Sequence, residues 1–315
     1  METIRSIDAI NKIPASILTM GSYDGLHRGH QEIIKRVVSI AQIKNVPSVV
    51  VTFDPHPRHI LEESTTKLPL ILNLENKLKL LEEFGIDYAL VIPFTKEFSE
   101  KPAHSFLDDL IVYNFNPAHI IIGYDHHFGF KRDGSPEFLR EYCQQKQIHL
   151  DIVKPVADEG LIISSTNIRK LITSGYVRRA SFELGWVYGF RANVIHGKGR
   201  GKVLHYPTAN FTPLDDNQLL PKNGVYLTRG RVDGLQLYGM CNLGVRPTFS
   251  EGEFVMEVHF FNPTLLNIYN RIILVEFLER IREEKKFNSQ DELIEQLKKD
   301  ETICKQLQKK YDQED

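Results

Sequence analysis

The chain has 315 residues, and at about 150 residues per domain this length predicts two domains. Its 39 Lys and Arg residues nearly balance its 41 Asp and Glu residues, which gives a formal net charge of -2. This balance argues against nucleic acid or an anionic membrane as a partner, so any basic site must be local.

The first part of the chain has the pattern of an α/β Rossmann-like domain. From residue 16 to about 185, short β-branched runs alternate with helical periodicity, which is typical of βαβ units on a parallel sheet. Apolar stripes over residues 33–41 and 74–84 predict helices that pack against this sheet. The expected strands cover residues 17–20, 48–53, 88–92, 119–122 and 150–153.

After Gly185 the pattern changes to period-two strands and turns, which predicts a small antiparallel β-barrel or sandwich. A capping box of Ser289 and Glu292 then opens a C-terminal helix. We therefore expect two domains, residues 1–185 and 186–315, with a boundary near 184–188. The expected strands of the second domain cover residues 224–229, 237–242, 255–260 and 271–278, with a hairpin turn at 232–235.

The turn between the first expected strand and the first helix carries the first candidate site. Parallel sheets bind ligands beyond the carboxyl ends of their strands, and the free N–H groups of a helix N-terminus favour phosphate. His27 and His30 can both face one anionic group, and this H-x-G-H arrangement is typical of nucleotidylyltransferases. The residues of this turn that we assign to ATP are Gly21, Asp24, Gly25 and Gly29.

A second segment, Ser164, Ser165 and Thr166, precedes Arg169 at the start of another expected helix. Hydroxyl groups at such a position can serve only as an N-cap. Together with a guanidinium three residues on, they can also bind phosphate groups. We therefore assign these four residues to the phosphates of ATP.

With the runs at 53–57 and 123–129, these segments resemble the adenylyltransferase half of prokaryotic bifunctional riboflavin kinases/FAD synthetases. The resemblance implies transfer of AMP from ATP to FMN, which yields FAD and pyrophosphate. The FMN phosphate is largely ionised because its second pKa is about 6, so no general base is needed. Positioning and charge neutralisation by His27, His30, Arg169 and Mg²⁺ would then suffice. The flavin contacts implied by the resemblance are Phe53, His56, Pro57, Asp125 and Phe128.

The chain departs from the family pattern in two places. The family commonly has Asn-Phe where this chain has Ser22-Tyr23, and it has Glu-Asp-Phe-Arg-Phe at residues 124–128. His127 stands where the family has Arg, so this chain lacks a permanent positive charge at that position. Flavin affinity is the property that this departure affects.

The second candidate site begins at a basic loop, residues 197–202. The loop fits neither a Walker A nor a G-x-G-x-x-G motif, so it is either a solvated turn or a phosphate-binding loop. Residues 206–210 resemble the riboflavin kinase signature, which implies that Thr208 and Asn210 hold the Mg²⁺ of MgATP. The loop residues that we assign to ATP are Gly197, Lys198, Gly199, Arg200, Gly201 and Lys202.

A riboflavin kinase must deprotonate a neutral hydroxyl group, so it needs a proton acceptor. Strand alternation places Glu257 on the same face as Val255. A lone Glu on a strand is usually a surface residue, but the family has its base in a matching Glu-x-His strand. The resemblance also places Arg282 near the flavin. The family segments matching residues 261–262 and 266–270 are altered here.

We predict a bifunctional enzyme that makes FMN and then FAD from riboflavin with MgATP. The alternatives are an adenylyltransferase with a weak or inactive kinase domain, a flavin-sensing regulator without turnover, and an RNA-linked nucleotidylyltransferase. The regulator is disfavoured because the candidate catalytic residues are intact, namely the histidine pair, Thr208, Asn210 and Glu257. The RNA-linked nucleotidylyltransferase is disfavoured because the sequence shows no basic face.

Cys143, Cys241 and Cys304 are isolated, which disfavours a disulfide framework. The histidines at 56, 59, 126 and 127 lack further ligands at the spacing that zinc needs.

Early charged residues exclude a signal-peptide core, and no stretch approaches the length of about 20 apolar residues that spans a membrane. We therefore expect a cytoplasmic protein that binds small molecules, with no nucleic acid or membrane partner. The sequence does not determine the oligomeric state, and a weak homo-oligomer is compatible with it.

Overall fold

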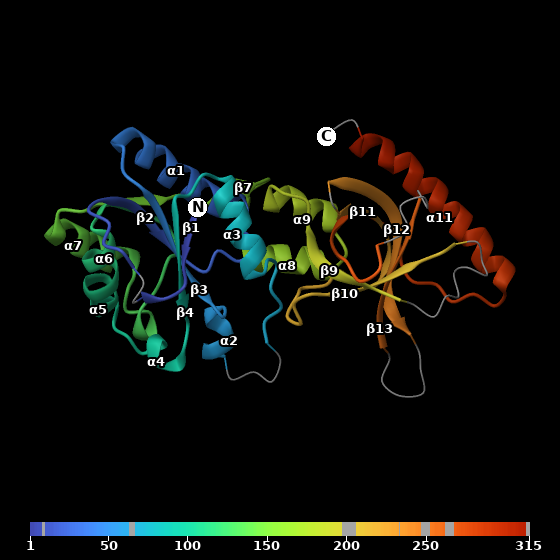
Figure 1. The fold of residues 1–315 in the computed structure, drawn as a ribbon, viewed down its shortest axis with the longest axis horizontal. Helices are drawn as coiled ribbons and strands as arrows, with labels where there is room; N and C mark the ends of the chain where they lie inside the picture. Colours follow the sequence, from blue (N-terminus) through green and yellow to red (C-terminus); the bar gives the residue numbers. More distant parts are fainter. Residues whose placement is uncertain are drawn as a thin grey trace. The chain divides into compact units, whose positions relative to one another are not determined.

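The computed structural model describes residues 1–7, 10–62, 67–196, 206–232, 234–246, 253–261 and 268–312. The chain divides into two compact units, Met1–Ser165 and Thr166–Asp315 (Figure 1). This division places the two helices before residue 185 in the second unit. The functional boundary near 184–188 stays a prediction.

The first unit contains a six-stranded sheet in the order β1-β4-β3-β2-β5-β6. Every pairing in it is parallel, which confirms the α/β prediction. The five predicted strands are confirmed, and a sixth strand of three residues was not predicted. The strands are β1 (Glu2–Ile4), β2 (Ser16–Met20), β3 (Ser48–Asp54), β4 (Tyr88–Pro93), β5 (Pro117–Gly123) and β6 (His149–Val153).

Helices cover both faces of this sheet. Along the chain, the strands alternate with the helices α1 (Arg28–Lys44), α2 (Pro57–Leu61), α3 (Leu74–Glu83), α4 (Lys96–Ser99), α5 (Ala103–Ser105), the π-helix η2 (Phe106–Val112), α6 (Tyr113–Phe115), η3 (Phe130–Arg132) and α7 (Pro136–Lys146). One core joins Ile92 of β4 to Leu107 of η2 and Leu139 of α7. Another joins Val91 of β4 to Leu78 of α3. Because neighbouring strand residues point to opposite faces, η2 and α7 lie across the sheet from α3.

The second unit is built around a closed antiparallel barrel in the order β10-β13-β12-β11-β14-β9. Of the two predicted architectures, the structure shows the barrel and not the sandwich. The pairing of Val232 with Leu235 confirms the predicted hairpin. Strands β9 and β10 were not predicted. The strands are β9 (Gly189–Ile195), β10 (Ala209–Pro213), β11 (Gly224–Val232), β12 (Leu235–Arg246), β13 (Glu253–Phe260) and β14 (Ile272–Arg282).

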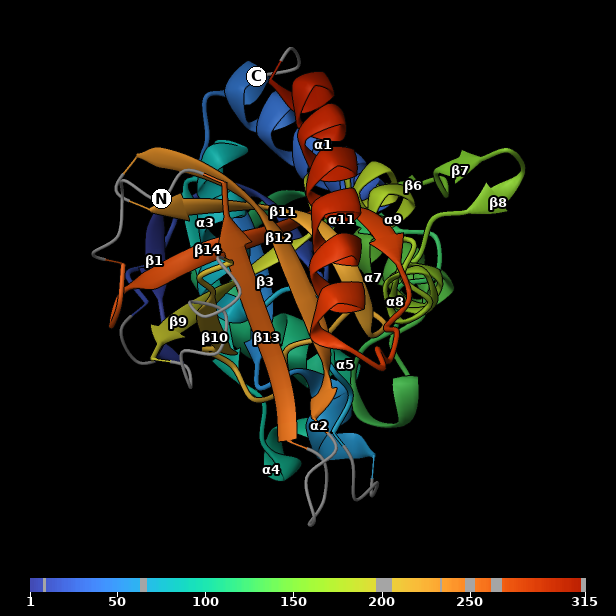
Figure 2. The ribbon, with the colours of Figure 1, turned by 90° about the vertical axis from the view of Figure 1, so that its right-hand side faces the viewer.

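Among the described residues of this unit, the helices are α8 (Ser165–Thr173), α9 (Val177–Leu184) and α11 (Gln290–Tyr311). Figure 2 shows α11 running along the outside of the barrel, where it contacts β11, β12 and β14. The backbone N–H of Glu292 donates to Ser289 Oγ at 3.2 Å, which confirms the predicted N-cap. Figure 2 also shows the short hairpin of β7 (Ala157–Asp158) and β8 (Leu161–Ile162), which belongs to the first unit. Among the described residues, no helix is both long and apolar enough to cross a membrane.

Candidate active sites

A stacked pair of histidines lies at the N-terminus of α1, just beyond the carboxyl end of β2. The rings of His27 and His30 lie 3.7 Å apart at an angle of 18°, and the backbone N–H of His30 donates to Nδ1 of His27 at 3.4 Å. Burial lowers the pKa of His27 to about 4. Burial, followed by the charges of His27 and Lys77, also holds the pKa of His30 well below its usual value. Both imidazoles are therefore neutral at pH 7, and a phosphate beside them would favour their charged forms.

Glycine gives this turn room where it approaches the rings. A Cβ atom on Gly29 would lie 3.2 Å from the His27 ring, and one on Gly21 would lie 3.0 Å from the Tyr23 ring. The Tyr23 hydroxyl is buried and lies 2.6 Å from Thr19 Oγ1, while its ring meets His30 edge to face at 5.2 Å. The Tyr that departs from the family pattern therefore supports the histidine pair through a hydrogen bond that Phe could not make.

Asp24 ties the turn to two other segments. Its buried carboxylate accepts from the backbone N–H groups of Ile71 and Leu72 at 3.1 and 3.2 Å. Its backbone carbonyl accepts from Ser165 Oγ at 2.8 Å. Ser165 thus lies against the glycine turn, at the start of α8. The contacts of Asp24, Gly25, Ser164, Thr166 and Arg169 with ATP stay predictions.

The pattern analysis missed Lys77. This lysine of α3 is 5% exposed, and its Nζ donates to the Ser22 carbonyl at 2.7 Å and to Thr52 Oγ1 at 3.3 Å. One signal was present in the sequence: position 77 lies three residues after Leu74 and four before Leu81, inside the apolar stripe of the predicted helix.

An aromatic series joins the two segments predicted to bind flavin. Phe53 at the end of β3 lies 6.2 Å from Phe98, which lies 6.0 Å from Phe106. Phe106 in turn lies 5.6 Å from Phe128, in the loop after β5. The structure thus brings Phe53 and Phe128 to one apolar wall. His56 caps α2 by accepting from the backbone N–H of Arg58 at 3.2 Å, and Pro57 is the first residue of that helix.

Side chains of the loop after β5 contact one another and the loop's own backbone. His127 Nδ1 lies 2.9 Å from the carbonyl of Asp125, and the ring of His126 stacks on Phe128 at 5.5 Å. His126 Nε2 is buried without a hydrogen-bond partner among the described residues, and burial lowers its pKa to about 4.

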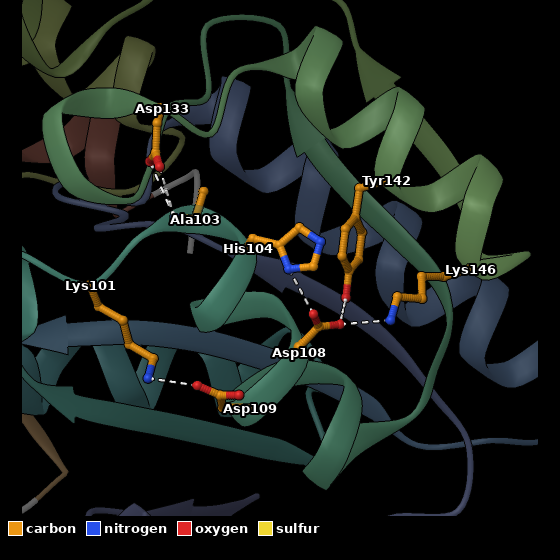
Figure 3. A network of polar contacts seen from close by, with 8 residues as sticks. All are labelled: Lys101, Ala103, His104, Asp108, Asp109, Asp133, Tyr142 and Lys146. Carbon is orange, nitrogen blue, oxygen red and sulfur yellow. Dashed lines mark hydrogen bonds and ion pairs between the residues drawn. The ribbon is translucent and has the colours of Figure 1, made fainter.

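Polar contacts at the base of the same loop fix its position (Figure 3). The carboxylate of Asp133 accepts from the backbone N–H of Ala103 with both oxygens at 3.2 Å. On the π-helix, Asp108 pairs with Lys146 at 2.8 Å and accepts from the Tyr142 hydroxyl at 2.8 Å. These contacts tie the loop to α5 and tie α7 to the π-helix.

In the barrel, register brings two predicted residues face to face. Asn210 of β10 and Glu257 of β13 are direct partners in the antiparallel ladder. Directly opposite residues carry their Cβ atoms on one face, about 4.5–5.5 Å apart. The predicted magnesium ligand and the predicted base therefore lie side by side.

Neighbouring contacts anchor the segment that carries Thr208. The Tyr206 hydroxyl lies 3.0 Å from Glu301 Oε2 on α11, and His259 Nδ1 lies 2.9 Å from the Pro207 carbonyl. The Tyr206 and His259 rings meet edge to face at 5.0 Å. The beginning of the signature is thus held by both α11 and β13. The predicted phosphate loop, residues 197–202, lies outside the described residues, as do residues 262–267 of the altered segment.

Arg282 has a structural partner that the sequence did not indicate. Its guanidinium binds the buried carboxylate of Asp300 on α11, through Nε at 2.9 and 3.0 Å and through Nη2 at 2.7 Å. Its Nη1 donates to the carbonyl of Glu283 at 2.8 Å. The contact of Arg282 with flavin stays a prediction.

Comparison with known proteins finds a family match for each part of the chain. Residues 10–167 match the FAD synthetase family and residues 184–308 match the riboflavin kinase family. A bifunctional riboflavin kinase/FMN adenylyltransferase of Listeria monocytogenes is 34% identical over 93% of this chain and 91% of its own. That of Escherichia coli K12 is 32% identical over 98% of both chains.

A solved structure of similar fold comes from Streptococcus pneumoniae and is described as a macrolide-efflux protein. It has a TM-score of 0.88 and 32% identity, and the match covers 96% of this chain and 98% of that one. With two family matches in series and relatives above 30% identity along nearly the whole length, this chain belongs to the bifunctional riboflavin kinase/FMN adenylyltransferase family.

Proposed function

We propose that the first unit transfers AMP from ATP to FMN and that the barrel unit phosphorylates riboflavin. One chain then converts riboflavin to FAD in two steps, with ATP as a substrate of both. The observation that carries this proposal is that each unit brings two of its predicted residues together. His27 stacks on His30 in the first unit, and Asn210 pairs with Glu257 in the second.

In the adenylyl transfer, an oxygen of the FMN phosphate attacks the α-phosphorus of ATP. The bond from this phosphorus to the bridging oxygen of the β-phosphate breaks, and pyrophosphate leaves. The histidine pair enters as neutral imidazoles whose N–H groups can donate to phosphate oxygens. The N-terminus of α1, capped by His27, adds favourable backbone dipoles. Gly21 and Gly29 let the triphosphate approach the backbone.

In the kinase step, the terminal hydroxyl of the ribityl chain attacks the γ-phosphorus, ADP leaves, and Glu257 accepts the hydroxyl proton. Mg²⁺ prefers oxygen ligands, and the Thr208 hydroxyl and the Asn210 amide oxygen offer two of them. When bound, Mg²⁺ neutralises charge on the transferring phosphate. The pairing of Asn210 with Glu257 supports this assignment, because a base at Glu257 would then act beside a metal held by Asn210.

We also propose that the protein acts in the cytoplasm on small molecules, without a nucleic acid or membrane partner. The near balance of acidic and basic residues supports this part. Self-association stays a prediction that size-exclusion chromatography with light scattering would test.

The test of the two-site assignment is chromatographic separation of riboflavin, FMN and FAD after incubation with MgATP. His30→Ala should abolish FAD formation from FMN while riboflavin phosphorylation continues, and Glu257→Gln should do the reverse. His149→Ala and Glu295→Gln, at exposed positions of the two units, are the matched controls and should keep both activities. Loss of both reactions from either site variant in folded protein would show that the two-site assignment is wrong.

A further inference from the structure

A buried lysine lies behind the histidine pair, and packing alone does not account for it. Lysine is almost never buried unless its ammonium is paired, because desolvation of the charge is costly. Lys77 is 5% exposed and occupies the apolar stripe of α3, where Leu78 and Leu81 pack in the core. A leucine or methionine at this position would serve the core without that cost, so the ammonium calls for another explanation.

The ammonium lies at the edge of the sheet where parallel folds bind ligands. It donates to the carbonyl of Ser22, two residues beyond β2, at 2.7 Å, and to Thr52 Oγ1 in β3 at 3.3 Å. Strands β2 and β3 are neighbours, and Met20 pairs with Val51. Lys77 therefore joins the carboxyl ends of two adjacent strands and holds the carbonyl of the residue that follows Gly21 in the glycine turn.

The charges around this ammonium keep it protonated at neutral pH. Burial lowers the pKa of Lys77 to about 8, while the carboxylates of Asp24 and Asp54 favour its charged form. Its positive charge is also felt at His30, whose pKa it helps to lower. The ammonium is thus electrostatically coupled to the ring that we place against the triphosphate.

We propose that Lys77 is a positioning residue of the adenylyl transfer, which fixes the glycine turn through the Ser22 carbonyl and supplies a positive charge behind the histidine pair. Negative charge accumulates on the pyrophosphate as it leaves, and a fixed positive charge in water-poor surroundings stabilises such a transition state. The inference rests on the proposed adenylyltransferase function of the first unit.

The test compares Lys77→Met with Lys79→Met in the full-length chain. Methionine keeps the length and apolar character of the side chain but removes the charge and the donors. Lys79 is exposed on the same helix and is the matched control. We expect Lys77→Met to lower kcat for FAD formation about 100-fold, the effect typical of losing one preorganised electrostatic group. The KM values of Lys77→Met for FMN and ATP should change less than its kcat, and its rate of riboflavin phosphorylation should equal that of the wild type. Lys79→Met should have wild-type rates of both reactions.

A pH profile separates this role from a purely structural one. With a pKa of about 8, the Lys77 ammonium loses its proton as the pH rises, so kcat/KM of the wild type for FAD formation should fall above pH 8. The FMN phosphate does not contribute there because its second pKa is about 6. Lys77→Arg, which stays charged, should retain at least a tenth of the activity and lose this alkaline fall.

Several results would overturn the inference. They are a folded Lys77→Met within threefold of wild-type kcat, an equal loss in folded Lys77→Arg, or a wild-type profile that is flat above pH 8. The wild-type profile carries the test even if the methionine variant fails to fold. A wild-type chain that makes no FAD from FMN and MgATP would instead refute the proposed function, so the two failures are distinguishable.

Discussion

Replacing Asp300 by alanine should loosen α11 from the barrel. Asp300 is 1% exposed, and its carboxylate binds the Arg282 guanidinium through two nitrogens at 2.7 to 3.0 Å. Gln296, one turn earlier on α11, donates to the same carboxylate at 2.9 Å. The variant removes all of these acceptors at once and leaves the arginine without its partner.

The expected cost follows from this geometry. Breaking a buried ion pair by removing one partner costs about 3–5 kcal/mol, because the remaining charge is left uncompensated. The Arg282 side chain is 20% exposed, so water screens part of its charge. We therefore expect Asp300→Ala to lower the free energy of unfolding of the barrel unit by about 2–3 kcal/mol.

Tryptophan fluorescence in urea is the assay. Trp186 is the only tryptophan of the chain and lies in the second unit, just before β9, so its signal reports that unit. Glu295→Ala is the matched control on α11, because its ion pair with Lys299 is exposed on both sides and contributes little. An Asp300→Ala variant within about 0.5 kcal/mol of the wild type, the usual range of a surface substitution, would refute the anchoring role of the Arg282–Asp300 pair.

Three further predictions concern the first unit. Gly29→Ala places a Cβ atom 3.2 Å from the His27 ring and should lower FAD formation at least tenfold without affecting riboflavin phosphorylation, as product chromatography would show. Phe128→Ala removes one end of the aromatic series and should raise KM for FMN, by about tenfold for the loss of one aromatic contact, with a smaller change for ATP. The pKa of His126 is lowered to about 4 in the folded chain against 6.5 unfolded, so only the unfolded chain binds this proton between those values. Stability is therefore lost as the pH falls from 6.5 toward 4, and His126→Phe should reduce that loss when melting is followed by circular dichroism at pH 5 and pH 7. An unchanged acid sensitivity would contradict this assignment.

The sheet of the first unit was predictable because its strands are buried on both faces. Parallel strands covered by helices are continuous apolar runs, and β3 and β4 show this pattern clearly. Strand β1 was not predictable, because three residues of mixed character carry no period and form a strand only by pairing with β4. Local sequence therefore sufficed where burial was complete, and it failed where a tertiary partner decided the conformation.

Register explains what was missed in the barrel site. Thr208, Asn210 and Glu257 could be selected from the sequence, but a shift of one residue would place Glu257 on the opposite face from Asn210. Strand β10 has only five residues and follows a segment without strand periodicity, so nothing local fixes its alignment with β13. The pairing of Asn210 with Glu257 emerges only when the barrel closes.

Lys77 and Arg282 show two opposite limits of a motif-based assignment. Arg282 lies in a segment that resembles the family, yet three of its guanidinium nitrogens already bind Asp300 and Glu283. A flavin contact would have to use the remaining donors or displace Asp300, which makes stability the first property that Arg282 controls. Lys77 lies in no motif, but a charged residue inside an apolar helical stripe contradicts the pattern around it. Because burying an ammonium is costly, such a contradiction points to a functional reason even when no family signature does.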